Sequence, residues 1–194
     1  MQQIILDIVD YLKDFVTNNN VFLGFFIGVF IIVLESIIPI LPLAVFIALN
    51  ILVFGNVVGF LMCWIATVLG CSVSFLIFRK GLSHKIYKLD DNSRTLRLMN
   101  IISNISFSKL VIIMAIPFTP AFSVNIGAGL SKLKFKKFLF ACIIAKVAMI
   151  YFWGFIGTTL AESITDITVI IKLTIILIIA FIISKFVINK FDVD

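Results

Sequence analysis

The chain of 194 residues is 62% hydrophobic and 13% charged, contains 21 Phe, and carries a formal net charge of +6. No soluble fold of this size has enough interior to hide so much apolar surface, which excludes an ordinary soluble domain. We therefore expect an all-α polytopic membrane protein, a single membrane domain over residues 1–194, whose basic charge meets lipid rather than nucleic acid.

The N-terminal residues predict an interfacial helix followed by a span. In residues 1–14, apolar side chains and three Asp fall on opposite sides at helical spacing, which is typical of an amphipathic helix at the interface. Phe15 to Leu34 is about long enough to cross a bilayer. Three Asp are the wrong charge for the start of a signal peptide, so we expect this first span to remain in the mature protein.

Glu35 is the only charged residue in a long apolar run. A carboxylate there is costly without a partner or a wet cavity, which makes it a functional candidate. Pro39 and Pro42 follow within two turns, and a helix broken in the bilayer must be covered by protein or cavity water. The apolar piece after them, residues 43–54, is too short to cross easily and predicts a re-entrant hairpin.

Residues 56–78 predict a second span, which ends at Arg79 and Lys80 as it meets the cytoplasmic headgroups. Residues 82–108 are the most polar part of the chain, and we expect a cytoplasmic loop with an amphipathic helix. We favour a role in holding basic charge against anionic lipid over a specific binding site there.

A second interrupted apolar segment runs from Lys109 to Leu130, with basic residues before it and after it. Basic clusters on both flanks place both ends in the cytoplasm, which predicts a second re-entrant hairpin. The interruptions are Pro117, Pro120, Asn125, Gly127 and Gly129.

Residues 138–160 and 168–187 predict a third and a fourth span, separated by an acidic outer turn at Glu162 and Asp166. Counting crossings places both termini in the cytoplasm. The first hairpin then enters from outside and the second from inside.

All four prolines lie in two Pro-x-x-Pro units, which stand 78 positions apart. Paired interrupted segments in the two halves of a membrane protein indicate an inverted pseudo-repeat, with a binding site where the broken helices meet. The alternative is that the prolines only kink two helices. We favour the repeat because the opposite entry sides follow from the charges and not from the prolines.

Candidate site residues gather at these breaks. Free backbone groups could hold an anion or a headgroup, Asn125 adds an amide, and glycines at 127 and 129 allow close approach. Lys146 lies eight residues into the third span and is the candidate partner of Glu35, unless it reaches the interface about 12 Å away. We expect Arg79 and the lysines at 132 and 134 at headgroup level.

Cys63, Cys71 and Cys142 all lie in apolar runs without the spacing of metal ligands, so we expect them to be buried small hydrophobes. His84 has no Cys or carboxylate at metal spacing. We therefore expect no metal and no cofactor, and since no nucleophile and base pair stands out, no enzyme.

Taken together, residues 30–160 resemble the DedA or VTT-domain superfamily, also called the SNARE-associated Golgi proteins. The resemblance rests on Glu35 with the first proline pair, on Arg79-Lys-Gly81, and on residues 116–130 with Phe135 and Phe138 after them. The second motif is the more specific, because Pro-x-x-Pro, Asn and the Ala-Gly-Leu-Ser turn occur in order.

The resemblance implies opposed re-entrant hairpins that move lipids between leaflets, by scrambling phospholipid or by flipping polyprenyl phosphate in bacteria. Glu35 matches the membrane acid of the family. Many members carry an Arg where this chain has Met114, and DedA proteins in the narrow sense often carry another acid where it has Leu43 and Ala44. These two departures argue against an Arg-dependent, proton-coupled mechanism.

The leading expectation is therefore a lipid scramblase or flippase with about four transmembrane helices plus two hairpins. The alternatives are a proton- or ion-coupled solute transporter and a non-transporting membrane scaffold. Membrane lipids are the expected partners, a homo-oligomer is left open, and we expect a bacterial plasma membrane location.

Overall fold

The computed structural model describes residues 21–38, 43–82, 102–119, 121–163 and 166–190, with isolated positions before them. These residues are helical or in short connections, and no strand occurs among them, which confirms the all-α class. The expected interfacial helix over residues 1–14 and most of the polar loop over residues 82–108 lie outside the described residues, as do the prolines at 39, 42 and 120.

Three of the four expected spans are helices long and apolar enough to cross a membrane: Asn56–Lys80, Phe135–Ala161 and Ile167–Asn189. Each begins and ends within a few residues of the range expected from the sequence. The helices in chain order are α2 (Val21–Ile37), α3 (Leu43–Phe54), α4 (Asn56–Ile77) with the π-helical η1 (Phe78–Leu82), α7 (Phe107–Ala115), α8 (Ala121–Leu130), α9 (Phe135–Ser163) and α10 (Ile167–Lys190).

The first expected span differs from the structure. Among the described residues it corresponds to α2, which has 17 residues and belongs with α3 and α8 to the shorter apolar helices. The helix also continues through Glu35 to Ile37, so the carboxylate lies on the last turn of α2 and not in the connection that follows. The sequence alone could not show this, because the apolar run continues through both arms of the break.

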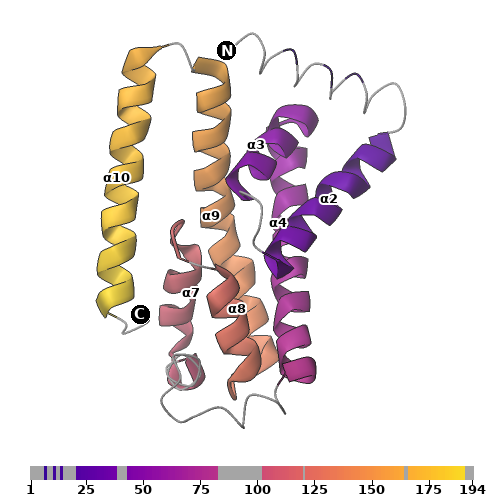
Figure 1. Ribbon diagram of the computed structural model, residues 1–194, viewed down its shortest axis with the longest axis vertical. Coiled ribbons are helices and arrows are strands. Elements are labelled where there is room, and N and C mark those ends of the chain that lie inside the picture. The colour runs from indigo at the N-terminus through magenta and orange to yellow at the C-terminus, as the bar shows by residue number, and fades with distance from the viewer. Residues whose placement is uncertain are drawn as a thin grey trace.

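The long helices α4, α9 and α10 run along the length of the molecule, and the short helices pack beside them (Figure 1). The α2 and α3 pair lies along the upper half in this view, and the α7 and α8 pair along the lower half. Helix α4 contacts α2, α3, α8 and α9, whereas α10 packs on α9. The two broken pairs thus approach the middle of the molecule from opposite ends.

The second proline pair breaks the helix as predicted. Helix α7 ends at Ala115, and Ile116 is extended with φ −73° and ψ 128°, because a residue that precedes proline is driven out of the helical region. The backbone then turns, with the Thr119 N–H donating to the Ile116 carbonyl at 3.2 Å, before α8 begins at Ala121.

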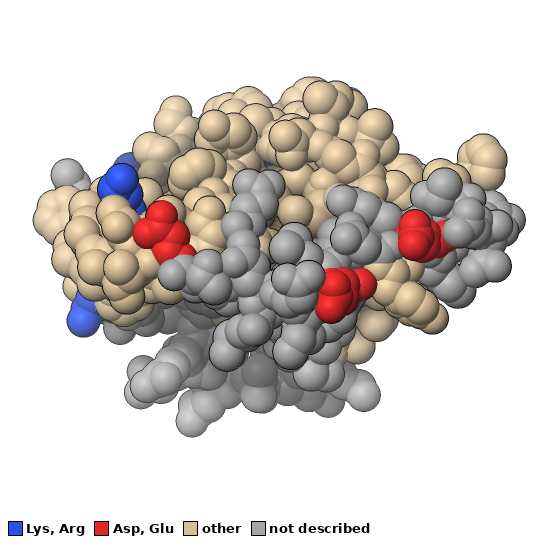
Figure 2. Space-filling view, turned by 90° about the horizontal axis from the view of Figure 1, so that it is seen from above, with Lys and Arg blue, Asp and Glu red and all other residues tan. Residues whose placement is uncertain are grey.

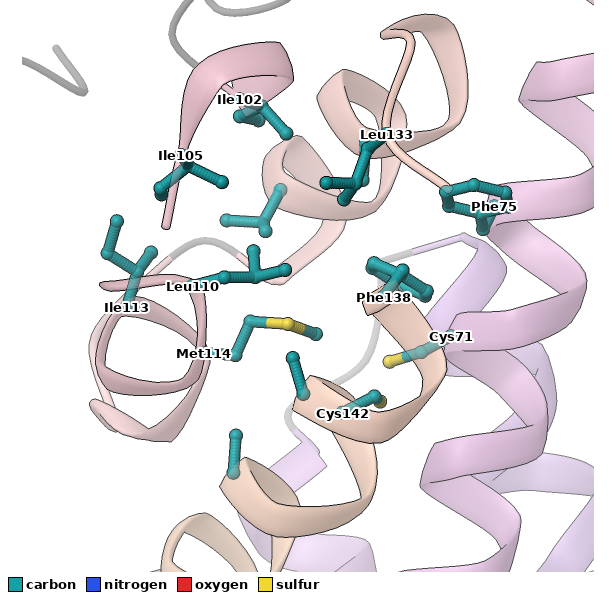
Figure 3. Close-up of a cluster of buried hydrophobic side chains, with 14 residues drawn as sticks. Cys71, Phe75, Ile102, Ile105, Leu110, Ile113, Met114, Leu133, Phe138 and Cys142 are labelled. Carbon is teal, nitrogen blue, oxygen red and sulfur yellow. The ribbon is translucent and has the colours of Figure 1, made fainter. Parts of the chain in front are cut away.

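Each short pair has its own apolar cluster against α4 and α9. The upper cluster includes Ile32, Ile47 and Ile150. In the lower cluster Phe75 of α4 stacks on Phe138 of α9 with ring centroids 4.7 Å apart (Figure 3). All three cysteines are buried and free, as predicted, and two of them join this lower cluster.

Small residues bring α2 close to α4. A Cβ built on Gly70 would stand 2.5 Å from the Ser36 Cβ, which is closer than real side chains allow. Glycine at this position therefore lets the last turn of α2 lie directly on α4, as small residues do at helix contacts in membranes. Because Glu35 lies on that turn, this contact sets its position.

Candidate functional site

A cavity of about 490 Å³ lies between the last turn of α2, the first turn of α3, the second proline segment with α8, and the helices α4 and α9. Glu35 and the second proline segment, which the sequence predicts to be two halves of one site, both line this cavity. Its lining comes from α2 and α3 (Glu35, Ser36, Leu43, Ala44), α4 (Thr67, Cys71), the second break and α8 (Pro117, Thr119, Ala121, Phe122, Ser123, Asn125) and α9 (Lys146, Met149, Trp153).

Lys146 is the cationic group of the cavity. Its side chain is fully buried, and its Nζ donates to the Met149 Sδ at 3.0 Å. The alternative in which Lys146 reaches the membrane interface is therefore wrong. Half-buried Glu35 attracts Lys146, but over a distance longer than a direct ion pair. Lys146 thus holds a buried positive charge whose hydrogen-bond partner is a weakly accepting sulfur.

Two polar side chains of the second break are buried without a partner. Asn125 is fully buried, and within the described part of the chain neither its Nδ2 nor its Oδ1 makes a hydrogen bond of normal geometry, although its side chain lies near the Cys71 thiol. The Thr119 hydroxyl is also buried and unpaired there. By contrast, the hydroxyls of Ser36 and Thr67 donate to carbonyls of their own helices at 3.0 and 2.7 Å.

Orphaned polar groups are rare in folded proteins, because leaving a buried donor or acceptor unpaired is costly. When such groups line a cavity, water or a ligand completes their hydrogen bonds. Asn125 and Thr119 therefore indicate that the cavity receives a polar occupant.

The beginning of α8 adds hydrogen-bond donors and positive potential to the cavity. Ala121, Phe122 and Ser123 form its first turn and line the cavity. The first N–H groups of a helix have no acceptor within the helix, and the helix dipole is positive at that end. Together with Lys146 and the Asn125 amide, this turn offers hydrogen-bond donors and positive potential to an anion.

Arg79 lies outside this cavity and caps the far end of α8. Its guanidinium donates to the carbonyls of Ala128 at 3.1 Å, Gly129 at 2.5 Å and both Ser131 and Leu133 at 2.8 Å. The group also lies over the Phe75 ring, 4.7 Å from the centroid. Arg79 therefore supplies the donors that the last carbonyls of a helix lack. A headgroup role for it stays a prediction.

The other predicted site residues that the structure describes lie outside the cavity lining. Gly127 and Gly129 are buried on α8, and a Cβ on Gly129 would stand 2.7 Å from the Phe75 carbonyl, so this glycine permits close packing on α4. Lys132 and Lys134 are exposed in the connection from α8 to α9.

Sequence analysis missed several lining residues. On α9, the missed residues Met149 and Trp153 follow the predicted Lys146 at i+3 and i+7, which places all three on one helix face, so this signal was available. On α4, Thr67 and Cys71 are also one turn apart. Nothing in the sequence, however, indicates which face of α4 meets the breaks.

Comparisons with known proteins identify the family of this chain. The family model for the VTT domain matches residues 38–159. The chain is also 33% identical over 144 residues to the uncharacterized membrane protein YhjE of Bacillus subtilis (strain 168), an alignment that covers 74% of this chain and 70% of that protein. No solved structure matches the chain. On the family match and this relative, the chain belongs to the VTT-domain, or DedA, family of integral membrane proteins.

Proposed function

We propose that this protein moves lipids with a phosphate headgroup, phospholipid or polyprenyl phosphate, between the two leaflets of the membrane. The observation that carries the proposal is the cavity that joins both breaks, with buried Lys146 and unpartnered Asn125 in its wall. A phosphate accepts hydrogen bonds from an ammonium, an amide and a helix start alike.

The barrier to lipid exchange is the passage of a polar headgroup through about 30 Å of hydrocarbon. A cavity with hydrogen-bond donors in its wall lowers this barrier by replacing lost water contacts with protein donors. Under this proposal α2 with α3, and α7 with α8, are re-entrant hairpins of an inverted repeat that enter from opposite faces. The protein then carries out transport and no chemical reaction.

Glu35 has a separate role in this proposal. It is the only carboxylate among the described lining residues, and it faces the cavity with Lys146. We propose that Glu35 neutralises Lys146 when no lipid is bound. When a zwitterionic lipid is bound, Glu35 neutralises the cationic part of its headgroup. For a zwitterionic headgroup, the empty and the occupied cavity then both have balanced charge, which keeps the cost of the buried ammonium low.

The charge distribution supports the predicted orientation. Arg79, Lys80 and the lysines that follow α8 lie at the end where α4 finishes and α9 starts, the lower end in Figure 1. The opposite end, viewed in Figure 2, is mostly uncharged over its described surface, with a few acidic and basic side chains. Since basic residues mark the cytoplasmic side, we place the lower end in the cytoplasm of the plasma membrane.

The test is leaflet exchange of a fluorescent phospholipid in proteoliposomes that contain wild type, Lys146→Met or Lys172→Met. Lys172 is an exposed lysine of α10 and serves as the matched control. We expect exchange above empty vesicles for wild type and for the Lys172 variant, and a loss of most of it for Lys146→Met. Equal exchange in all three proteins would refute the assigned role.

A second candidate is a proton- or ion-coupled solute transporter, which the same Glu35 and Lys146 arrangement would also suit. That candidate requires flux driven by a pH or ion gradient, whereas lipid exchange in our proposal proceeds without one. A pure scaffold, the third alternative, requires that Glu35→Gln leave wild-type lipid exchange unchanged or that no exchange exist at all.

A further inference from the structure

A second hollow of about 310 Å³ lies beside the headgroup cavity, between α3, α9 and α10. We call it the chain groove. It shares two lining residues with the cavity, Ala44 and Trp153, so the two spaces adjoin. No charged, hydroxyl or amide side chain is among its lining residues, whereas the cavity has all three.

We propose that the chain groove receives one alkyl chain of the lipid whose phosphate lies in the headgroup cavity. The inference rests on the proposed function and adds a second binding site, its ligand chemistry and the side on which lipid enters. Under this proposal, lipid enters through the opening between α3 and α10, across the face of α9.

The first argument is continuity. A lipid can place its headgroup in a protein cavity only if an apolar opening lets the attached chain remain in hydrocarbon. The chain groove is such an opening, because it adjoins the cavity and presents only apolar surface, including Leu52, Leu160 and Leu177. A water-soluble solute would need no apolar extension of this kind.

The second argument is the junction at Trp153. Its ring makes an edge contact with Phe118, a residue of the second proline segment, with centroids 5.5 Å apart. Phe118 in turn contacts Phe181 of α10 at 5.6 Å. The break that lines the cavity is therefore connected through aromatic rings to both α9 and α10, two walls of the groove.

The third argument concerns affinity. Lipid tails outside the protein are as apolar as the groove, so the hydrophobic effect gives the bound chain little advantage over bulk lipid. The groove therefore guides a chain and does not bind it tightly. Selective occupancy of the groove must come from the headgroup bound in the adjoining cavity. Measuring where the lipid chain lies is therefore more informative than measuring the affinity of the protein for the lipid.

The experiment is photo-crosslinking in nanodiscs with an alkyl phosphate that carries a diazirine a few carbons from its headgroup. Three proteins are compared: wild type, Leu177→Trp, which fills the groove, and Ile178→Trp. Ile178 is the adjacent residue, exposed and outside the groove lining, and so is the matched control. Leu160→Phe fills the groove from α9 and replaces Leu177→Trp if that variant does not fold.

In wild type and Ile178→Trp we expect labelling concentrated on groove residues of α3 and α9, several-fold above other lipid-facing positions. In the groove-filled variant we expect that enrichment to be lost. Even labelling over all lipid-facing helices, or unchanged groove labelling in a folded filled variant, overturns the inference.

Leaflet exchange measured on the same three proteins separates this inference from the proposed function. Enriched groove labelling in a wild type that exchanges no lipid supports the groove and refutes the proposed function. Lipid exchange by a wild type whose labelling is even refutes the groove and leaves the proposed function standing.

Discussion

At the scale of single residues, the site is built from groups whose burial costs free energy. Among the described residues, Lys146 is buried with a sulfur as its hydrogen-bond partner, and the buried Asn125 amide makes no hydrogen bond of normal geometry. Proteins retain such residues where function requires them, because an apolar replacement would stabilise the fold. The cost is therefore itself a sign of the site.

The first residue-scale prediction concerns Asn125→Leu, a change of similar branched shape. Because the native amide is unpaired, its removal should leave stability unchanged or raise it by about 1 kcal/mol, while lipid exchange falls. Thermal unfolding in detergent and leaflet exchange in vesicles measure the two effects.

Asn50→Leu is the contrasting control for this prediction. The Asn50 amide donates to the Phe46 carbonyl at 2.8 Å and lies against Gly28, so this variant should lose stability. If Asn125→Leu destabilised the protein as much as Asn50→Leu, the Asn125 amide would have a structural partner and our account of it would fail.

Met114 stands where the resemblance described above implies an arginine in many members of the family. It is buried in the lower apolar cluster beside Leu110 and Cys142 (Figure 3). The arginine that many family members carry at this position would need charged or polar partners there. In this chain the cation of the site comes from Lys146 instead.

At the scale of elements, Arg79 holds the short helix α8 in place. A nine- or ten-residue helix is marginal on its own, and the last carbonyls of α8 depend on donors from outside the helix. The π-helical turn of η1 carries Arg79, whose guanidinium contacts these carbonyls and so ties the end of α4 to α8. The position of Asn125 in the cavity thus depends on a residue outside it.

Arg79→Met should therefore lower the free energy of unfolding by about 2–4 kcal/mol, because several buried carbonyls lose a charged donor. Arg79→Lys should recover only part of this, since an ammonium lacks the planar fork that serves carbonyls side by side. Unfolding of the purified protein by denaturing detergent provides the measurement.

Lys80→Met is the matched control for Arg79, because Lys80 is the next residue and is exposed. Its replacement should change the free energy of unfolding by no more than about 0.5 kcal/mol. Comparable losses in Arg79→Met and Lys80→Met would show that capping of α8 does not depend on Arg79.

Sequence patterns predicted most of the helices but not where every helix ends or which long-range contacts join them. Apolar length gave α4, α9 and α10, and the second proline pair gave the break between α7 and α8. The start of the first break was placed too early, because the apolar run around Glu35 contains no signal for where α2 ends. The Arg79 cap joins residues about 50 positions apart, a contact that local patterns cannot reveal.

At the scale of the whole molecule, the candidate site arises from the meeting of two broken pairs. Sequence reasoning brought together Glu35, Pro117, Asn125 and Lys146, which all line the cavity. It could not supply Thr67 and Cys71, since α4 reads as an ordinary span. The face that α4 turns to the breaks is decided by packing, including the contact of Gly70 with Ser36.

The molecule offers a direct test of orientation, because its native cysteines are all buried and react little. Ser108→Cys places a thiol at the exposed start of α7, near the basic end, and Ile167→Cys places one at the exposed start of α10. In intact spheroplasts a membrane-impermeant maleimide should label the Ile167 variant and reach the Ser108 variant only after permeabilisation. The reverse pattern would invert the proposed orientation.

The most direct measurement of the central claim is a density map of the wild-type protein in nanodiscs of anionic phospholipid, with a bound antibody fragment to aid alignment. We predict headgroup density in the cavity, adjoining Lys146 and Asn125 where the two breaks meet. A well-resolved cavity without lipid, in which Lys146 and Asn125 hydrogen-bond only to other groups of the protein, would contradict the account.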